Sequence, residues 1–306
     1  MLITPLQQAS CADRRAVSRG PDPSDWIVPS LPVGWRLLSF HFFVDWMQSP
    51  PLLANRVWMT RQVRFEHESE MAEELESDLL SLFKKSEDRR YFEGLERVCS
   101  NYRHDLSAII LPDIPVSVIT EQTPIWAIRR KENADLGIGK YSVSNLKTAI
   151  QGHSGGPVKV GTKGLKFGTS AVECFLSSSD AAFPGDADGV VVDDQNQVRF
   201  VIEYKKHTIG DVIDNHLINR YYPRPDGRKY KRLEALRSHY ERVNQLPTPL
   251  VILYFSTREP VIRLQEIARL NDHSVDIRRD SGNINIGGMH PDDIAKQVVQ
   301  WLGIQI

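Results

Sequence analysis

Residues 184–206 read PGDADGVVVDDQNQVRFVIEYKK, and this stretch decides the expected fold. Two apolar runs flank a polar segment, DDQNQ at 193–197, in which Asp and Asn favour a turn. The pattern predicts two strands, DGVVVDD at 188–194 and QVRFVIEYK at 197–205, joined by that turn. Hairpin geometry then brings Asp188, at the start of the first strand, close to Glu203 and Lys205 in the second.

The charges at the end of this hairpin are unusual for an interior strand. Side chains alternate along a strand, so Glu203 and Lys205 share one face and Tyr204 takes the other. Charged groups entering an apolar sheet are costly unless partners or a metal ion compensate them. Carboxylate oxygens suit magnesium or manganese rather than zinc. A purely structural charged hairpin is the alternative interpretation.

The stretch resembles the PD-(D/E)xK nuclease superfamily over about residues 165–260. The resemblance rests on Asp188 before GVVV and on FVIEYK with Glu203 and Lys205, in the order helix, hairpin, helix and strand. It implies an α/β fold, with a restriction-endonuclease-like mixed sheet flanked by helices. The sequence departs from the family pattern because Pro184 is followed by Gly-Asp-Ala-Asp, which leaves Asp186 as a competing or accessory ligand.

The resemblance also implies a divalent-metal-dependent nuclease that uses Mg²⁺ or Mn²⁺ and cuts DNA in preference to RNA. Asp188 and Glu203 would bind the ion together with the main-chain carbonyl of Tyr204. Lys205 would orient the attacking water and stabilise the developing charge. Glu173, in the expected helix SAVECFLSS, would complete the site.

A basic segment follows the hairpin. NRYYPRPDGRKYKRL at 219–233 carries six cations and three tyrosines around one acid, Asp226. Clustered cations contact phosphates and tyrosines stack on bases, so the segment predicts nucleic-acid contacts. A solvated connector before a helix is the alternative. The predicted contact residues are Lys206, Arg220, Tyr222, Arg224, Arg228, Lys229, Lys231 and Arg232.

The rest of the chain supports a three-part organisation. Residues 1–25 are expected to be a flexible arm, 26–151 an α+β region for recognition or dimerisation, and 152–306 the nuclease domain. Period and composition predict strands at 56–66, 107–112, 115–120, 124–130 and 249–257, and a small hairpin within 269–290. Helices are expected at 68–88, 170–178, 209–222, 230–246, 261–270 and 291–303.

Composition limits the partners and the compartment. The net charge of −1 requires any nucleic acid to meet a local basic patch. Cys11, Cys99 and Cys174 are few, odd in number and far apart, which suits a reducing cytoplasm without a disulfide framework. The first residues show no signal peptide, and no run is apolar enough to span a membrane. A homodimer is compatible with this composition.

One motif suggests a different chemistry. GHSGGP at 152–157 is similar to the serine-protease signature GDSGGP, but His153 replaces the acid and no upstream histidine has the expected surroundings. A tight glycine turn is the preferred interpretation. The function hypotheses are therefore a nuclease, a catalytically weak or inactive nucleic-acid-binding module of the same fold, and a protein-interaction domain, with a serine hydrolase last.

Overall fold

The structure is a computed structural model that describes residues 1–6, 9–11, 21–65, 75–159, 165, 167–208 and 210–305. The chain forms two compact units. The first takes residues 1–16 and 40–186, and the second takes residues 17–39 and 187–306. The boundary expected at residue 152 falls inside the first unit, near the end of a helix.

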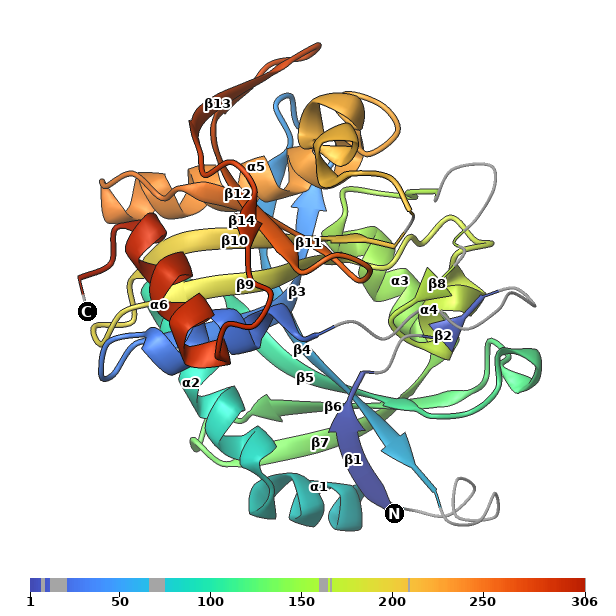
Figure 1. The fold of residues 1–306 in the computed structure, drawn as a ribbon. Helices are drawn as coiled ribbons and strands as arrows, with labels where there is room; N and C mark the ends of the chain where they lie inside the picture. Colours follow the sequence, from blue (N-terminus) through green and yellow to red (C-terminus); the bar gives the residue numbers. More distant parts are fainter. Residues whose placement is uncertain are drawn as a thin grey trace. The chain divides into compact units, whose positions relative to one another are not determined.

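The first unit is built on a mixed sheet (Figure 1). Its strands follow the order β3 (Arg36–Asp45), β4 (Leu52–Arg64), β5 (Asp105–Pro112), β6 (Pro124–Arg130) and β7 (Leu136–Ser142). β4 and β5 are parallel, and the other neighbours are antiparallel. Residues Leu2–Pro5, expected in a flexible arm, instead form β1, which pairs with β4.

Helices and short elements complete the first unit. Part of the helix expected at 68–88 lies outside the described residues, and the remainder is split where Ser86 adopts extended backbone. The strand expected at 115–120 is a 3-10 turn, Val116–Val118, between Pro115 and Ile119. The elements are α1 (Glu76–Lys85), α2 (Glu87–Asn101), α3 (Val143–His153), α4 (Ala171–Leu176), and the paired β2 (Ala9–Ser10) and β8 (Phe167–Gly168).

The strands of the second unit also have mixed directions, and they confirm the predicted hairpin. The strand order is β13 (Val275–Asp280), β12 (Val261–Leu270), β11 (Leu250–Ser256), β10 (Val198–His207) and β9 (Gly185–Val192). β9 and β10 are antiparallel, while β10 and β11 are parallel. β14 (Ile284–Asn285) also pairs with β12. The α/β class is therefore confirmed at the level of mixed sheets with helices.

Two helix predictions in this unit are wrong. Residues 261–270 form β12 because β11 offers an antiparallel hydrogen-bonding edge, and Ile262 and Leu264 then alternate into the core. Their apolar residues also fit a helical period, so the sequence alone did not discriminate between the two states. In place of the helix expected at 209–222, the described residues 210–222 contain two short 3-10 turns, Ile213–His216 and Ile218–Arg220.

In the second unit, each face of the sheet packs against a helix. On one face, Phe200, Ile202 and Leu253 join a core with α6 (Pro291–Leu302). Alternation turns Val201, Glu203 and Lys205 to the opposite face. There α5 (Gly227–Asn244) packs, and its Tyr230, Leu233 and Leu236 are buried (Figure 1).

This packing makes Leu253 a direct test of the second unit. Its side chain has no exposed surface in the central strand β11. Leu253→Ala should lower the free energy of unfolding by about 2–5 kcal/mol, because a buried cavity is left behind. Ile277→Ala in the edge strand β13, where Ile277 is 36% exposed, should change it by about 0.5 kcal/mol or less. Urea unfolding measures both, and equal effects would contradict the assigned core.

Candidate metal and phosphate site

The hairpin places Asp188 beside Glu203. Val201 lies opposite Val190 and Ile202 opposite Gly189. Asp188 Oδ2 accepts a hydrogen bond of 2.8 Å from the backbone N–H of Tyr204. The Asp188 carboxylate therefore lies against the Glu203–Tyr204 peptide, as the hairpin prediction required.

Glu203 is a buried acid with a cationic partner. Glu203 has 0% exposed surface, and its strand, β10, lies between β9 and β11. Lys229 Nζ, from the first turn of α5, lies 2.5 Å from Glu203 Oε1. A buried carboxylate requires such a counter-charge, because the desolvation of an unpaired ion in a protein costs on the order of several kcal/mol.

Lys205 is held on the same side of the sheet by three groups. Its ammonium pairs with Asp226, the residue that precedes α5. The same nitrogen lies 4.1 Å from the centroid of the Tyr221 ring and 6.0 Å from that of Tyr230. Ring faces attract cations, so these contacts fix the amine two residues beyond Glu203.

Two histidines extend this polar cluster. His216 Nδ1 lies 2.6 Å from the Tyr221 hydroxyl, and the His216 and His207 rings have centroids 4.3 Å apart. His216 Nε2 lies 3.6 Å from Asp211 Oδ2. These contacts orient the Tyr221 ring against Lys205.

Sequence reasoning missed the roles of Asp226, His216 and Tyr221 beside the hairpin. It grouped Lys229 with the phosphate contacts, whereas the structure pairs Lys229 with Glu203. The one available signal was Asp226, the single acid within a segment of six cations. An isolated acid in such a segment indicates a specific cationic partner, and that partner is Lys205.

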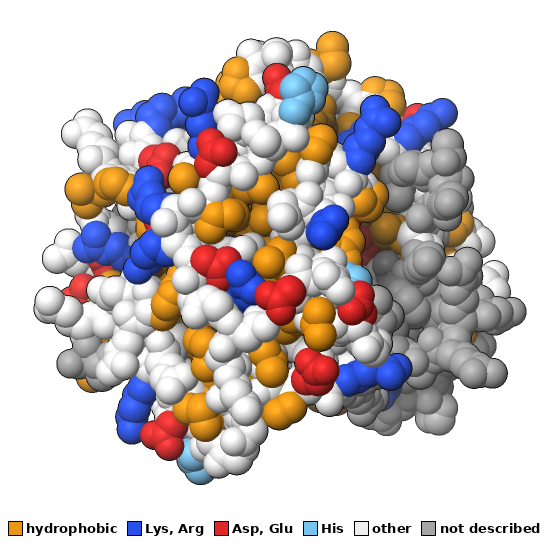
Figure 2. All heavy atoms as spheres, turned by 45° about the horizontal axis from the view of Figure 1, so that its top comes forward, with side chains coloured by type: hydrophobic (Ala, Val, Ile, Leu, Met, Phe, Trp, Pro, Cys, Tyr) orange, Lys and Arg blue, Asp and Glu red, His pale blue; other side chains and the backbone are white. Residues whose placement is uncertain are grey.

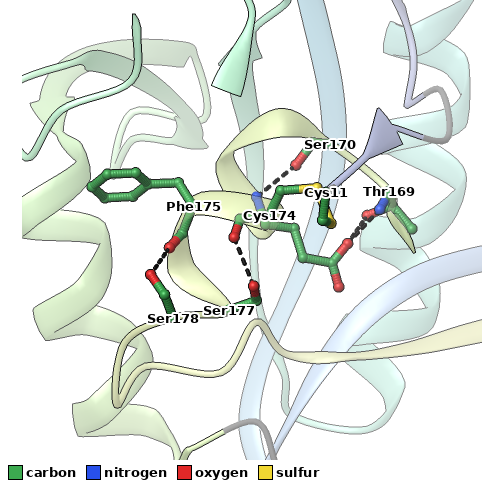
Figure 3. The surroundings of a disulfide bond; sticks show 8 residues. Cys11, Thr169, Ser170, Cys174, Phe175, Ser177 and Ser178 are labelled. Atoms are coloured by element: carbon green, nitrogen blue, oxygen red, sulfur yellow. Dashed lines mark hydrogen bonds between the residues drawn. A yellow bond between two sulfur atoms is a disulfide. The ribbon is translucent and has the colours of Figure 1, made fainter. Parts of the chain in front are cut away.

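Glu173 has a local structural role in the first unit. Its backbone N–H donates to Ser170 Oγ at 3.1 Å, and its carboxylate accepts from the Thr169 hydroxyl at 2.8 Å. These bonds cap the start of α4 (Figure 3). Because Asp188, Glu203 and Lys205 belong to the second unit, the predicted participation of Glu173 stays a prediction.

The residue after Glu173 corrects the expectation for the cysteines. Cys174 forms a disulfide with Cys11, so a chain expected to lack disulfide bonds has one (Figure 3). Cys99 is free and buried. The wide sequence separation concealed this pairing, because it depends on the fold rather than on a local motif. Disulfides persist mainly in oxidising compartments, so the predicted reducing cytoplasm has no support from this bond.

Asp186 lies near His41 within the first unit. His41 is buried, its Nδ1 lies 3.0 Å from the Thr60 hydroxyl, and its ring meets Phe183 edge-on. Burial lowers the pKa of His41 to about 4, while Asp186 acts in the opposite direction and Arg61 adds to the lowering. Asp186 is thus an electrostatic neighbour of a neutral imidazole.

The predicted phosphate contacts divide into exposed and buried residues. Arg220, Arg224 and Arg228 are exposed near the start of α5, and Lys206, Lys231 and Arg232 are partly buried. Lys231 lies 3.4 Å from Asp272. Tyr222 is a correction: it is 5% exposed and its hydroxyl donates to the Asn271 carbonyl, so its ring is not available to stack on a base.

Charges of both signs are mixed on the face that Figure 2 draws. Figure 2 shows basic side chains interspersed with acidic and apolar ones on the face that it draws, so the described residues there make no broad field of one sign. Polyanion binding therefore depends on a local cluster of cations. Arg220, Arg224 and Arg228 are exposed and lie within residues 220–228 of the chain, and these three residues are here called the arginine strip.

The GHSGGP motif is a helix end. Ser154 caps the C-terminus of α3, and Gly156 N–H donates to the Gln151 carbonyl at 2.9 Å. Gly155 has φ +76°, and a Cβ there would clash with the Asp45 carboxylate, so the turn favours glycine. Ser154 itself is buried at 6% exposure, which supports the turn interpretation over a nucleophile.

The acid pair is compatible with magnesium. No group of three or more His, Cys, Asp or Glu residues suited to a metal occurs in the described part of the chain. Magnesium, however, is commonly held by one or two carboxylates together with waters and substrate phosphates. Asp188 and Glu203 supply two such carboxylates around one peptide, and the buried Glu203 already attracts a cation.

Comparisons with known proteins leave the site to be judged on its own geometry. No family model matches the chain, and no curated protein matches it. A comparison with solved structures gives the sex pheromone staph-cAM373 precursor, at 10% identity over 89% of this chain and 84% of that chain, with a TM-score of 0.16. That similarity is too low to inform the fold. Separately, the helices among the described residues are too short or too polar to cross a membrane.

The His41 environment predicts a pH dependence of stability. Below about pH 6.5 the unfolded chain protonates His41, whereas the folded chain does so only near pH 4. The unfolded state therefore binds more protons in this window, and the free energy of unfolding falls as the pH drops from 6.5 to 4. The loss should total about 3 kcal/mol, at roughly 1.4 kcal/mol per pKa unit.

His41→Asn tests this assignment, because Asn keeps a polar atom for Thr60 and does not titrate. Urea unfolding between pH 4 and 7.5 should show a shallower pH dependence in the variant than in the wild type. Identical slopes for the two proteins would contradict the buried neutral imidazole.

Proposed function

We propose that the protein is a divalent-metal-dependent nuclease that hydrolyses phosphodiester bonds, with DNA favoured over RNA as the substrate. The observation that carries the proposal is the Asp188 carboxylate hydrogen-bonded to the Glu203–Tyr204 peptide, with Lys205 one residue further on. An acid, a buried acid and an amine on adjacent strands are the groups that metal-assisted phosphate chemistry needs. A restriction-endonuclease-like core, the finer form of the fold class, is part of this proposal.

Each residue has a role that follows from its chemistry. Asp188 and Glu203, with the main-chain carbonyl of Tyr204, would hold Mg²⁺ or Mn²⁺. When bound, the ion supplies positive charge to the phosphate and acidifies a bound water. Lys205 carries a compact ammonium that can orient the attacking water and stabilise charge on the phosphate. Asp226 and Tyr221 keep that ammonium on the sheet face shared with Glu203.

The arginine strip would hold the substrate backbone. Arg220, Arg224 and Arg228 lie in the segment that also contains Tyr221 and Asp226, the partners of Lys205. Exposed arginines bind phosphates in a sequence-independent manner. A homodimer, which would present two such sites, is a compatible assembly.

A nucleic-acid-binding module with little activity is the second candidate. It is favoured by the internal counter-charges of the site, since Glu203 pairs with Lys229 and Lys205 pairs with Asp226. Those pairs let the hairpin fold without a metal. This candidate predicts salt-sensitive binding without cleavage.

Cleavage assays on supercoiled, linear and single-stranded DNA and on RNA, in magnesium, manganese or chelator, separate the two candidates. We expect metal-dependent cleavage that Asp188→Ala and Lys205→Ala each reduce by about 100-fold or more, since each removes a group that stabilises the transition state. Asp194→Ala, which removes an exposed acid from the turn of the same hairpin, should leave cleavage unchanged. Cleavage that persists in chelator, or in both site variants, would refute the nuclease proposal.

Binding at different salt concentrations tests the arginine strip. Replacing Arg220, Arg224 and Arg228 together with Ala should reduce the dependence of log K on log salt by about 0.9 for each phosphate that these side chains neutralise in the wild type. The matched control replaces Arg89, Arg90 and Arg97, three exposed arginines of α2, and should leave the slope unchanged. Fluorescence anisotropy with a labelled duplex measures the slopes. Equal slopes in the two triple variants would remove the strip from the interface.

A further inference from the structure

The first turn of α5 carries the counter-charge of a site that a metal ion would also neutralise. Lys229 is 40% exposed along its side chain, yet its ammonium reaches Glu203, whose side chain is 1% exposed. One positive charge at this carboxylate is therefore required by the fold itself, because an unpaired ion there would be strongly destabilising. Either a lysine or a metal ion can meet that requirement.

A divalent ion and the Lys229 ammonium are poorly compatible at one carboxylate. Like charges a few ångströms apart repel, and the repulsion is strong where burial excludes water. Lys229 is also able to leave, since its four-carbon stem is flexible and partly exposed. The geometry thus provides two alternative cations for one buried acid.

A buried hydroxyl beside this acid supports a change of partners. Tyr230 follows Lys229 and has 0% exposed surface, and its hydroxyl has no hydrogen-bond partner among the described residues. Its pKa is raised, first by burial and then by neighbours that include Tyr254, Glu203 and Asp226. An unsatisfied buried donor costs about 1–3 kcal/mol. The arrangement with Lys229 inside therefore leaves a polar group that a rearranged or hydrated site would satisfy.

We propose that Lys229 competes with the divalent cation for Glu203, so that metal binding displaces this lysine from the site. The inference rests on the proposed nuclease function and adds a residue that sets its metal affinity. Because coupling between ligands is reciprocal, removal of the lysine must tighten metal binding by the factor by which the lysine weakens it.

Lys229→Met tests the competition, since Met keeps the length and apolar character of the stem without the charge. In chelator its thermal midpoint should fall by about 5 °C or more, and manganese should raise it further than it raises that of the wild type. Calorimetric titration with Mn²⁺ should give a dissociation constant at least about tenfold lower than that of the wild type. Lys296→Met, at an exposed lysine of α6 with the same change of charge, should leave both quantities unchanged.

A measurement on the wild-type chain avoids any folding defect of the variant. Acetylation of lysines by an amine-reactive ester, followed by mass spectrometry, should modify Lys229 faster in manganese than in chelator. Lys231, whose side chain is 43% exposed and which pairs with Asp272, is the internal control and should react at the same rate in both.

The outcomes distinguish this inference from the function on which it rests. Equal manganese affinity in the wild type and Lys229→Met, with unchanged acetylation of Lys229, overturns the competition and leaves the nuclease proposal intact. No manganese binding to either protein, together with an absence of metal-dependent cleavage, overturns the proposed function and the competition with it. Tighter binding in the variant and faster acetylation in manganese support the competition, and the cleavage assay alone decides the proposed function.

Discussion

The charge of Glu203 is the constraint around which the second unit is arranged. The side chain of Glu203 in β10 is 1% exposed, so its carboxylate requires a cation inside the protein. Lys229 supplies that cation, which requires the first turn of α5 to dock against this face. An apolar residue at position 203 would pack without any such requirement, and replacing a buried ion pair with apolar groups is often neutral or stabilising. Stability alone therefore does not account for an acid here.

The parts of the fold that the sequence predicts are those encoded locally. The β9–β10 hairpin and β11 combine strong apolar runs with a turn, and each forms as expected. The segment VIRLQEIARL fails because its apolar spacing suits both a helix and a strand. The segment is extended because β11 offers backbone hydrogen-bonding groups along one edge, and an extended partner can pair with them. Such a choice depends on tertiary contacts that no local pattern contains.

The same distinction applies to the site. Asp188 and Glu203 could be paired in advance because one short turn joins their strands. The partners of Glu203 and Lys205 could not be predicted in this way. They lie in or near α5, which follows two 3-10 turns in a segment that was expected to be helical. The sequence does not show which cation of a basic segment is buried against an acid and which is exposed. Only the docking of α5 separates Lys229, which meets a buried acid, from Arg228, which stays exposed.

The juxtaposition of acids and exposed arginines bears on which function fits. Phosphate groups are repelled by carboxylates, so an acid pair near the arginine strip weakens simple polyanion binding. The lysine partners of the acids reduce this repulsion, but they do not make the site attract phosphate. A divalent ion between carboxylate and phosphate would make the site attractive, because it carries one positive charge more than the Lys229 ammonium that it replaces. The combination of Asp188, Glu203 and the strip therefore supports the proposed metal-mediated contact with phosphate over binding by cations alone.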